Sequence, residues 1–332
     1  MTKLLRSCGV CAVILLLAVL TAASALQAQT GPPAKSQAPA QGAPAPASGN
    51  QGQPNAAAPG QAAEPDKRQP RAKSQDELDA YQKFMREQSA DQQIKLIEDF
   101  LLQFPNTELK EFAYQAATQA YQSKNDFNKV LTYGELTLAE NENNLVALLI
   151  LASAIPERTA KNDLDKESKL TQAEQYAKSA LAVLEKLSMP PNLTEQQWTQ
   201  VKRDAESSPH AALGMIALIR EDFPKAETEF KQSAEMAAKP DPVSLYRLGL
   251  CYSFQKKFEP ALEALDRAAA AGGVKLPGAD GSPRDLVSEA KDYVVKAKAA
   301  SETPVSGAVA APAAQPNPQP NPQSGPATKP NP

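Results

Sequence analysis

Residues 207–272 decide the fold: SSPHAALGMIALIREDFPKAETEFKQSAEMAAKPDPVSLYRLGLCYSFQKKFEPALEALDRAAAAG. The two halves of this stretch align when Gly214 is set over Gly249, 35 residues later. In each half an alanine follows the glycine after 12 residues, a large apolar residue comes four further on, and a small residue three beyond that. These positions are Ala226, Phe230 and Ser233 in the first half and Ala261, Leu265 and Ala268 in the second. A period of this size predicts stacked helical hairpins.

The pattern resembles the tetratricopeptide repeat, a 34-residue helix–turn–helix unit. The later unit carries the family's residue types at Leu245, Leu248, Gly249, Tyr252, Ala261, Leu265 and Ala268. The earlier unit matches at Leu213, Gly214, Ala226 and Phe230, but has His210 and Ala217 where larger aromatics are usual. A small residue on each helix lets the two axes approach closely. We therefore expect Gly249 to lie against Ala261, with no room for a side chain.

Weaker copies of the unit precede these two. An opening helix pair is predicted from about residue 75, where Ser74 and Glu77 have capping-box spacing, to Phe104. In the next unit Thr118 takes the place of the glycine, 34 residues before Ala152. Residues 145–155 are apolar nearly all round, which predicts a helix buried by neighbours on both sides. The fold class predicted is all-α: an α-solenoid of tetratricopeptide-like hairpins.

The spacing from Ala152 to Gly214 is 62 residues, about 28 more than one period. The surplus falls in a charged loop over 157–168 and in residues 188–208, which hold Trp198. Thr194 could cap a short helix in the second insertion, and His210 would lie at a helix start. Residues 188–208 are either a binding element or a helix that covers the joint between repeats, with Trp198 packed beneath it.

Composition divides the chain into four parts. Residues 1–28 read as a secretory signal, with cleavage after Ala25 or Ala28 and an uncleaved anchor as the alternative. Residues 29–74 and 301–332 are rich in proline and poor in large apolar residues, so we expect disordered arms, either spacers or solvated ends. The solenoid would span 75–300. We expect it to end in an amphipathic capping helix that starts at Ser282-Pro283 and has an apolar stripe. The stripe comprises Leu286, Ala290, Tyr293, Val294 and Ala297.

The sequence offers little for catalysis. The formal net charge of −3 gives no basic stripe for nucleic acid. One histidine, His210, and one cysteine outside the leader, Cys251, supply no zinc set. No phosphate loop, nucleophile elbow or calcium loop occurs. We predict a protein that is not an enzyme, binds no cofactor or metal, and is not stably inserted in a membrane after cleavage of the signal.

The resemblance implies a scaffold that binds another protein or peptide along the concave face, which the first helix of each unit lines. We expect it to be exported to the periplasm or envelope; the alternative is a permanent structural subunit of an envelope assembly, secretion or wall-synthesis machine. Carried over by register, the partner surface comprises Phe112, Gln115, Gln119, Gln122, Met215, Tyr246 and Ser253. Glutamines suit backbone amides because each can donate and accept. We expect a neutral, extended or helical ligand.

Overall fold

The computed structural model describes residues 70–278 and 281–302. The predictions for the leader, for the linker up to residue 69 and for the tail after residue 302 lie outside these residues. The described helices are α2 (Gln75–Arg86), α3 (Ala90–Gln103), α4 (Lys110–Ser123), α5 (Phe127–Glu140), α6 (Leu145–Arg158), α7 (Lys166–Lys186), α8 (Glu195–Ile219), α9 (Phe223–Met236), α10 (Pro242–Phe254), α11 (Phe258–Ala270) and α12 (Leu286–Glu302). A short antiparallel ribbon, β1 (Lys275–Pro277) and β2 (Pro283–Asp285), precedes α12.

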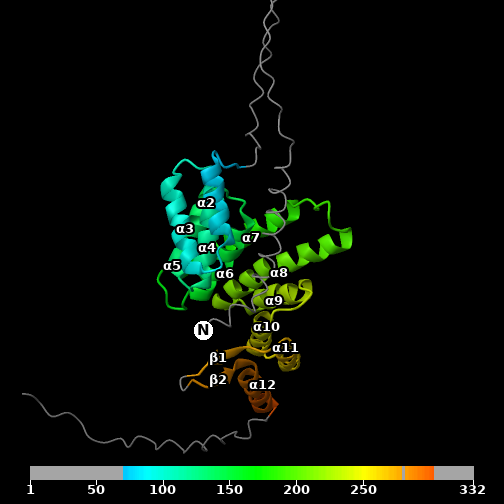
Figure 1. Ribbon diagram of the computed structural model, residues 1–332. Helices are drawn as coiled ribbons and strands as arrows, with labels where there is room; N and C mark the ends of the chain where they lie inside the picture. Colours follow the sequence, from blue (N-terminus) through cyan, green and yellow to red (C-terminus); the bar gives the residue numbers. More distant parts are fainter. Residues whose placement is uncertain (1–69, 279–280, 303–332) are drawn as a thin grey trace, which may run out of the picture.

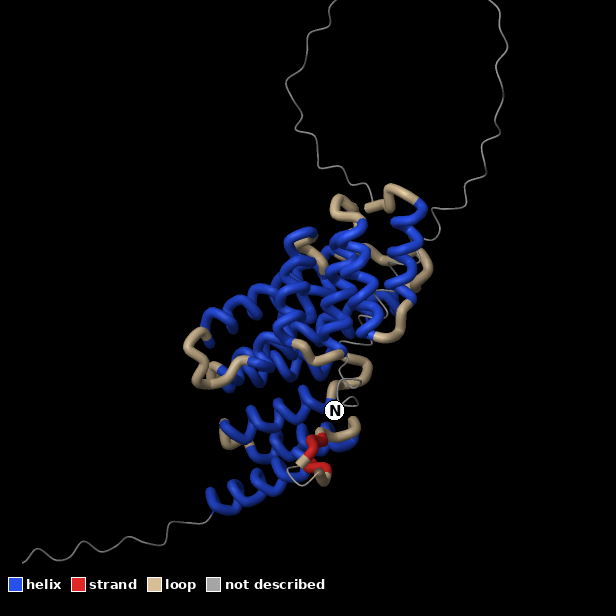
Figure 2. Tube along the Cα trace, turned by 60° about the vertical axis from the view of Figure 1, so that its left-hand side comes forward, coloured by secondary structure: helices blue, strands red, loops and turns tan. Residues whose placement is uncertain are grey.

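Consecutive helices pack in pairs, and the second helix of each pair also packs on the first helix of the next pair. Figure 1 shows the resulting stack, from α2 at one end to α12 at the other. Figure 2 shows that helices make up nearly all of it and that the ribbon lies close to the end formed by α12. This architecture confirms the predicted all-α solenoid.

The turn inside the hairpin is the same in three of the pairs. Asn125, Glu221 and Lys256 have φ values of 59°, 63° and 58°, the left-handed conformation that commonly ends a helix. In each turn the next residue donates its N–H to the carbonyl five residues earlier: Asp126 to Tyr121, Asp222 to Ala217 and Lys257 to Tyr252. The repeat is thus visible in the backbone, including α4–α5, where the side-chain signature is weak.

The core follows the predicted faces. Phe84, Phe100 and Ile97 are fully buried at the amino-terminal end. In α6, Leu148 and Leu151 are at most 2% exposed, as is every residue between them. This confirms the prediction that α6 is buried by neighbours on both sides, and it makes α6 the most buried helix of the described stack.

Helix α8 differs from the prediction. It runs without interruption from Glu195 to Ile219, so the second insertion is not a separate short helix but an amino-terminal extension of the repeat helix. Thr194 and Gln197 do form a capping box at its start. Pro209 lies inside the helix, and His210 is therefore not at a helix start. In Figure 1 the ends of α7 and α8 project to one side of the stack.

Two other predicted helix starts need correction. Pro283 belongs to β2, and α12 begins at Leu286; Asp285 accepts hydrogen bonds from the N–H groups of the two residues after Leu286. At α2 the predicted capping box is half formed. Ser74 Oγ accepts from the N–H of Glu77, but the Glu77 carboxylate accepts from Lys73 N rather than from Ser74 N. Asp285 thus caps α12 in place of Ser282, and Lys73 N takes the place of Ser74 N in the cap of α2.

The capping helix α12 also faces the stack less fully than predicted. Val294 is buried and Ala290 is 7% exposed. Tyr293, in contrast, is 59% exposed and lies off the packed face. The stripe is therefore narrower than the sequence indicated.

Candidate partner-binding surface

The predicted partner residues lie on the first helices of three hairpins, and we call them the helix-A surface. They are Phe112, Gln115, Gln119 and Gln122 on α4, Met215 on α8, and Tyr246 and Ser253 on α10. All but Ser253 are half-buried. These side chains therefore combine contact with the core and exposure to solvent, which is the state a docking residue needs.

Ser253 does not belong to this surface. Its side chain is 8% exposed, and its hydroxyl oxygen makes no hydrogen bond with another described residue. The register placed Ser253 on the partner surface, but its burial leaves little of the side chain for a partner to contact.

Gln115 is partly committed to the fold. Its Oε1 accepts from Asn144 Nδ2 at 2.8 Å, and Asn144 also donates to Glu111 Oε1 at 2.7 Å. The Asn144 side chain in turn caps α6 by accepting from Ala147 N at 2.9 Å. Asn144 thus ties α4 to the start of α6. The sequence marked neither Asn144 nor this bond, because nothing in the local pattern brings residue 144 to residue 115.

The helix-A surface is interrupted at α6. The α6 residues in register with the α4 set are Val146, Leu149, Ser153 and Pro156, of which all but Ser153 are buried. The exposed parts therefore form two patches. One lies on α4 with α2 beside it, and the other lies on α8 and α10.

The α2–α4 patch contains a residue that the sequence did not identify. Tyr81 of α2 meets Phe112 of α4 edge to face, with ring centroids 6.3 Å apart. The opening hairpin has a degenerate signature, so the register could not be extended to α2 from the sequence.

The predicted repeat-packing residues lie in the interior of their hairpins. Ala226, Phe230, Ala261, Leu265 and Ala268 are fully buried, and Tyr252 is half-buried. The two glycines meet large side chains of the second helix. A Cβ atom added to Gly214 would lie 2.8 Å from the Phe230 ring, and one added to Gly249 would lie 2.7 Å from Leu265 Cγ and 3.3 Å from the Ala261 carbonyl oxygen.

Ionic contacts join the middle hairpins. The Glu174 carboxylate of α7 accepts from Arg220 Nη1 at 2.6 Å and lies 2.9 Å from Lys178 Nζ. Lys225 of α9 reaches the same carboxylate at 3.5 Å. Hydrogen bonds from Arg220 and Lys178 lower the pKa of Glu174 to about 2. This cluster fastens α7 to the turn between α8 and α9, so its role is structural.

The extension of α8 is also fastened to the fold. Arg203 donates to the Glu235 carbonyl at 2.8 Å, and Asp204 accepts from Ala238 N at 2.7 Å. These contacts satisfy groups at the carboxyl-terminal end of α9. They support the covering-helix interpretation for this part of the insertion, while Trp198, nearer the tip, is half-buried.

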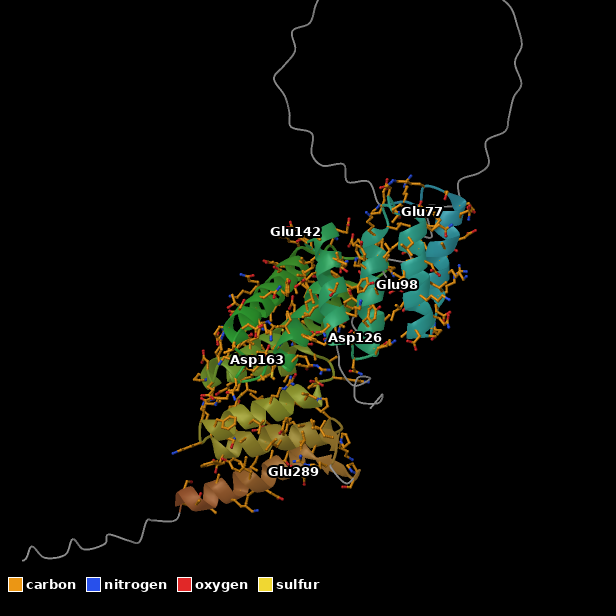
Figure 3. All side chains as sticks on the ribbon, turned by 90° about the vertical axis from the view of Figure 1, so that its left-hand side faces the viewer. Glu77, Glu98, Asp126, Glu142, Asp163 and Glu289 are labelled. Atoms are coloured by element: carbon orange, nitrogen blue, oxygen red, sulfur yellow. The ribbon has the colours of Figure 1, made fainter. Side chains whose placement is uncertain are left out.

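The described residues offer no reactive constellation. Burial raises the pKa of the Cys251 thiol to about 12, so this thiol stays protonated. His210 Nδ1 is paired with Glu229 at 2.7 Å within its own hairpin. No group of three or more histidine, cysteine and acidic residues among the described residues could hold a metal. The carboxylates that Figure 3 labels are spread along the stack: Glu77, Glu98, Asp126, Glu142, Asp163 and Glu289.

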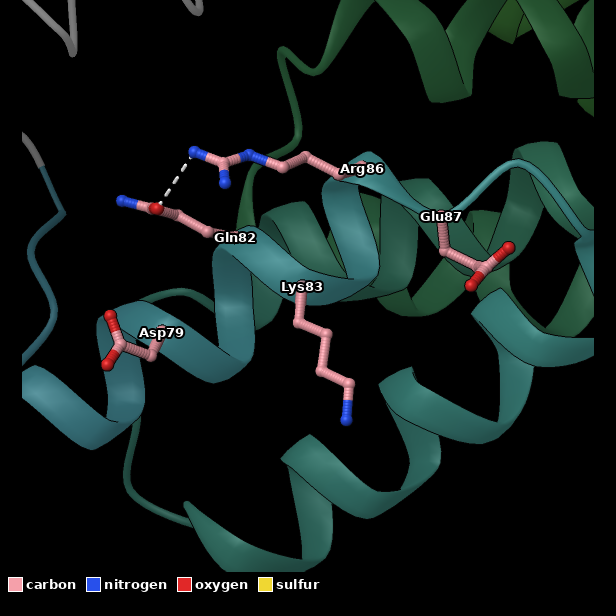
Figure 4. A pocket seen from close by; sticks show the side chains of 5 residues that line it. All are labelled: Asp79, Gln82, Lys83, Arg86 and Glu87. Carbon is pink, nitrogen blue, oxygen red and sulfur yellow. Dashed lines mark hydrogen bonds between the residues drawn. The ribbon is translucent and has the colours of Figure 1, made fainter.

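One pocket lies on the surface of α2, and Figure 4 shows it. It is lined by Asp79, Gln82, Lys83, Arg86 and Glu87. All five side chains come from one helix or the residue after it. Arg86 and Gln82 are hydrogen-bonded at 3.1 Å, whereas Asp79, Lys83 and Glu87 point in different directions. Because its polar groups do not converge, this pocket has no features of a small-molecule site.

Among the described helices, none has the length and apolar character needed to cross a membrane.

The repeated hairpins, their shared turn and the glycine contacts agree with the resemblance seen in the sequence. The fold is a stack of tetratricopeptide-like helical hairpins. No protein-family model matches the chain, and a search of curated proteins finds no match either. Among solved structures the chain is similar to a thermophilic TPR protein from Thermus thermophilus. The sequence identity is 16%, the match covers 67% of this chain and 98% of that chain, and the TM-score is 0.42.

Proposed function

We propose that this protein is a non-catalytic scaffold that binds another protein through the helix-A surface. The observation that carries the proposal is the row of half-buried, uncharged side chains on α4, α8 and α10. Such residues bury apolar area on docking and keep amide groups for the partner's backbone. Stacked hairpins in general suit this role, because they present extended surfaces rather than closed cavities.

The interruption at α6 sharpens the expected mode of binding. The α2–α4 patch is aromatic and amide-rich, with Phe112 and Gln119. The α8–α10 patch is aliphatic and aromatic, with Met215, Leu250 and Tyr246. A partner that bridges both would contact two separate anchors, and its binding would depend weakly on salt, since few charge pairs would form.

We further propose that the protein works outside the cytoplasm, in the periplasm or the envelope. The support is the sequence of residues 1–28, with its basic start, short apolar run and small-residue cleavage sites. Sequencing the amino terminus of the exported protein tests this part. A product that begins after Ala25 or Ala28 supports export with cleavage, whereas an intact Met1 in the membrane fraction favours an anchor.

One observation favours the second candidate, a permanent subunit of an envelope machine. Large apolar side chains are open to solvent away from the helix-A surface: Phe254 is 52% exposed, Val295 54% and Tyr293 59%. A stable assembly would cover such residues.

Crosslinking in intact cells, followed by mass spectrometry, tests the scaffold and separates it from the second candidate. We expect crosslinked peptides from α4, α8 and α10 and a partner lost on detergent extraction. Crosslinks confined to α12 and the end of α10, in a complex that survives detergent at fixed stoichiometry, would contradict the scaffold proposal. They would favour a permanent subunit of an envelope machine.

A further inference from the structure

The α2–α4 patch has unused hydrogen-bond donors beside an open aromatic pair. The rings of Tyr81 and Phe112 are both half-buried and meet edge to face. No hydrogen bond joins the Tyr81 hydroxyl, or the side-chain amides of Gln119 and Gln122, to another described residue. This patch therefore offers aromatic faces and several donors to whatever covers it.

The chain enters the solenoid next to this patch. Arg71 N donates to the Glu108 carboxylate at 3.2 Å, and Lys73 Nζ donates to the Asn106 carbonyl at 2.6 Å. Ala72 packs on the same apolar cluster as Phe112. Because Asn106 and Glu108 come just before α4, these contacts place Arg71 and Lys73 beside the beginning of α4.

The sequence of those residues complements the patch. Residues 54–69 read PNAAAPGQAAEPDKRQ. Each of the three prolines lacks an N–H, so this segment has more backbone acceptors than donors. Proline-rich segments bind aromatic surfaces that supply donors to their carbonyls. At about 3.1 Å per residue, 16 residues reach about 50 Å, more than the roughly 21 Å length of α4.

We propose that residues 54–69 dock on the α2–α4 patch, with proline rings on Tyr81 and Phe112 and backbone carbonyls accepting from Gln119 and Gln122. Lys67 and Arg68 would lie near Glu108, where the opposite charges favour the docked state. The docking itself needs no partner. Its consequence rests on the proposed function. A partner must displace residues 54–69 from the α2–α4 patch, while the α8–α10 patch stays open.

A photocrosslinker placed at Phe112 in the full chain tests this docking without any partner. Phe112→p-benzoylphenylalanine is irradiated in dilute purified protein, and the crosslinked peptides are mapped by mass spectrometry. We expect crosslinks to residues 54–69, at a yield independent of protein concentration. The matched control is the same probe at Phe254, which is 52% exposed at the end of α10 and should not reach the arm.

Equal arm crosslinks from both probes, or none from either, would overturn the proposal. A yield that rises with concentration would also overturn it, because a second copy would then be the occupant. If the Phe112 variant loses its helical circular dichroism signal, the probe moves to Met85, one turn from Tyr81 and 44% exposed. The crosslinks from Met85 are then interpreted in the same way as those from Phe112. This test does not depend on whether the protein binds a partner.

A pair of amide-to-acid changes tests the donors. Gln119→Glu with Gln122→Glu removes two side-chain NH2 groups, which carry four N–H donors. We expect the yield from Phe112 to fall about fivefold or more. Gln103→Glu with Gln232→Glu makes the same change on exposed sites of α3 and α9 and should leave the yield unchanged. An unchanged yield in the first pair would overturn the assigned role of the glutamines.

Discussion

The hairpins α4–α5 and α10–α11 use the same spacing but place their small residue on opposite helices. In α10–α11, Gly249 on the first helix meets Leu265, 16 residues later, on the second. In α4–α5 the same step leads from Thr118 to Gly134, so the glycine lies on the second helix. A Cβ atom at Gly134 would lie 2.7 Å from Leu151 Cδ2, a side chain of α6 in the next hairpin.

This difference shows where each hairpin makes its closest contact at a glycine. That contact lies within the hairpin in α10–α11, and between α5 and α6 for α4–α5. Leu151 is fully buried in the space that a side chain at position 134 would need. The close contact at a glycine therefore lies between hairpins at Gly134 and within a hairpin at Gly214 and Gly249.

Within a single hairpin, we expect Gly249→Leu to cause the greatest loss of stability. The new side chain would overlap Leu265, and overpacking of this kind costs about 1–3 kcal/mol or more. Urea unfolding measures the loss. Gln232→Leu, on an exposed site of α9, is the control and should change stability by less than about 0.5 kcal/mol. Equal unfolding midpoints for the two variants would show that the α10–α11 hairpin is not closely packed at Gly249.

The next effect is a coupling between hairpins. Leu151→Ala alone should cost about 2–5 kcal/mol because it opens a cavity. Combined with Gly134→Leu, the total should fall below the sum by about 0.5–3 kcal/mol, since the new leucine occupies the space that Leu151 leaves. In the control pair, Gly249→Leu with Leu151→Ala, the two costs should add. Additive costs in the first pair would contradict the assignment of Leu151 to that space.

A smaller effect distinguishes the helix caps of the two regions. Asn144→Ala loses the α6 cap and the bonds to Glu111 and Gln115, whereas Asp241→Ala loses bonds to Ser244 alone. We expect Asn144→Ala to cost about 1 kcal/mol more in thermal unfolding. Asn144→Asp keeps the cap acceptor but faces Glu111, so it should remain destabilised at pH 7. Equal losses for Asn144→Ala and Asp241→Ala would show that the link to α4 contributes nothing.

The smallest effect concerns pH. The folded-state pKa of Glu174 lies near 2, below its unfolded value of 4.5. Its stabilising contribution is therefore present above pH 4.5 and is lost as the pH falls toward 2. At pH 7 the free energy of unfolding should be about 1 kcal/mol higher for the wild type than for Glu174→Gln. This difference in stability should narrow between about pH 5 and 2. Glu235→Gln, which removes an exposed carboxylate 4.0 Å from Lys231, is the control. A gap independent of pH would contradict the pKa assignment.

The local pattern was sufficient to predict the hairpins, because Gly214 and Gly249 meet their large partners within one unit. It could not identify Gly134, whose partner Leu151 belongs to the next unit and depends on how two hairpins dock. The extension of α8 was missed for a related reason. Its residues bind the end of α9, 32 to 34 residues away, and these partners cannot be read from the local pattern.

The partner surface was predictable in outline but not in its limits. Spacing alone placed Gln119 and Tyr246 on the first helices of their hairpins. It did not show that Gln115 is bonded to Asn144, that Ser253 is buried, or that α6 divides the surface in two. Each of these depends on contacts between helices that are distant in sequence.

Two matched triple variants show whether the helix-A surface binds the partner. Gln119, Gln122 and Tyr246 are changed to alanine in one. The other variant changes three residues of the same types to alanine at exposed sites outside that surface: Gln103, Gln232 and Tyr293. Calorimetry measures the affinity of each folded variant for the partner recovered by crosslinking. We predict a loss of tenfold or more, about 1.4 kcal/mol, in the first variant and no change in the second. Unchanged affinity in the first variant, with a loss in the second, would contradict the account.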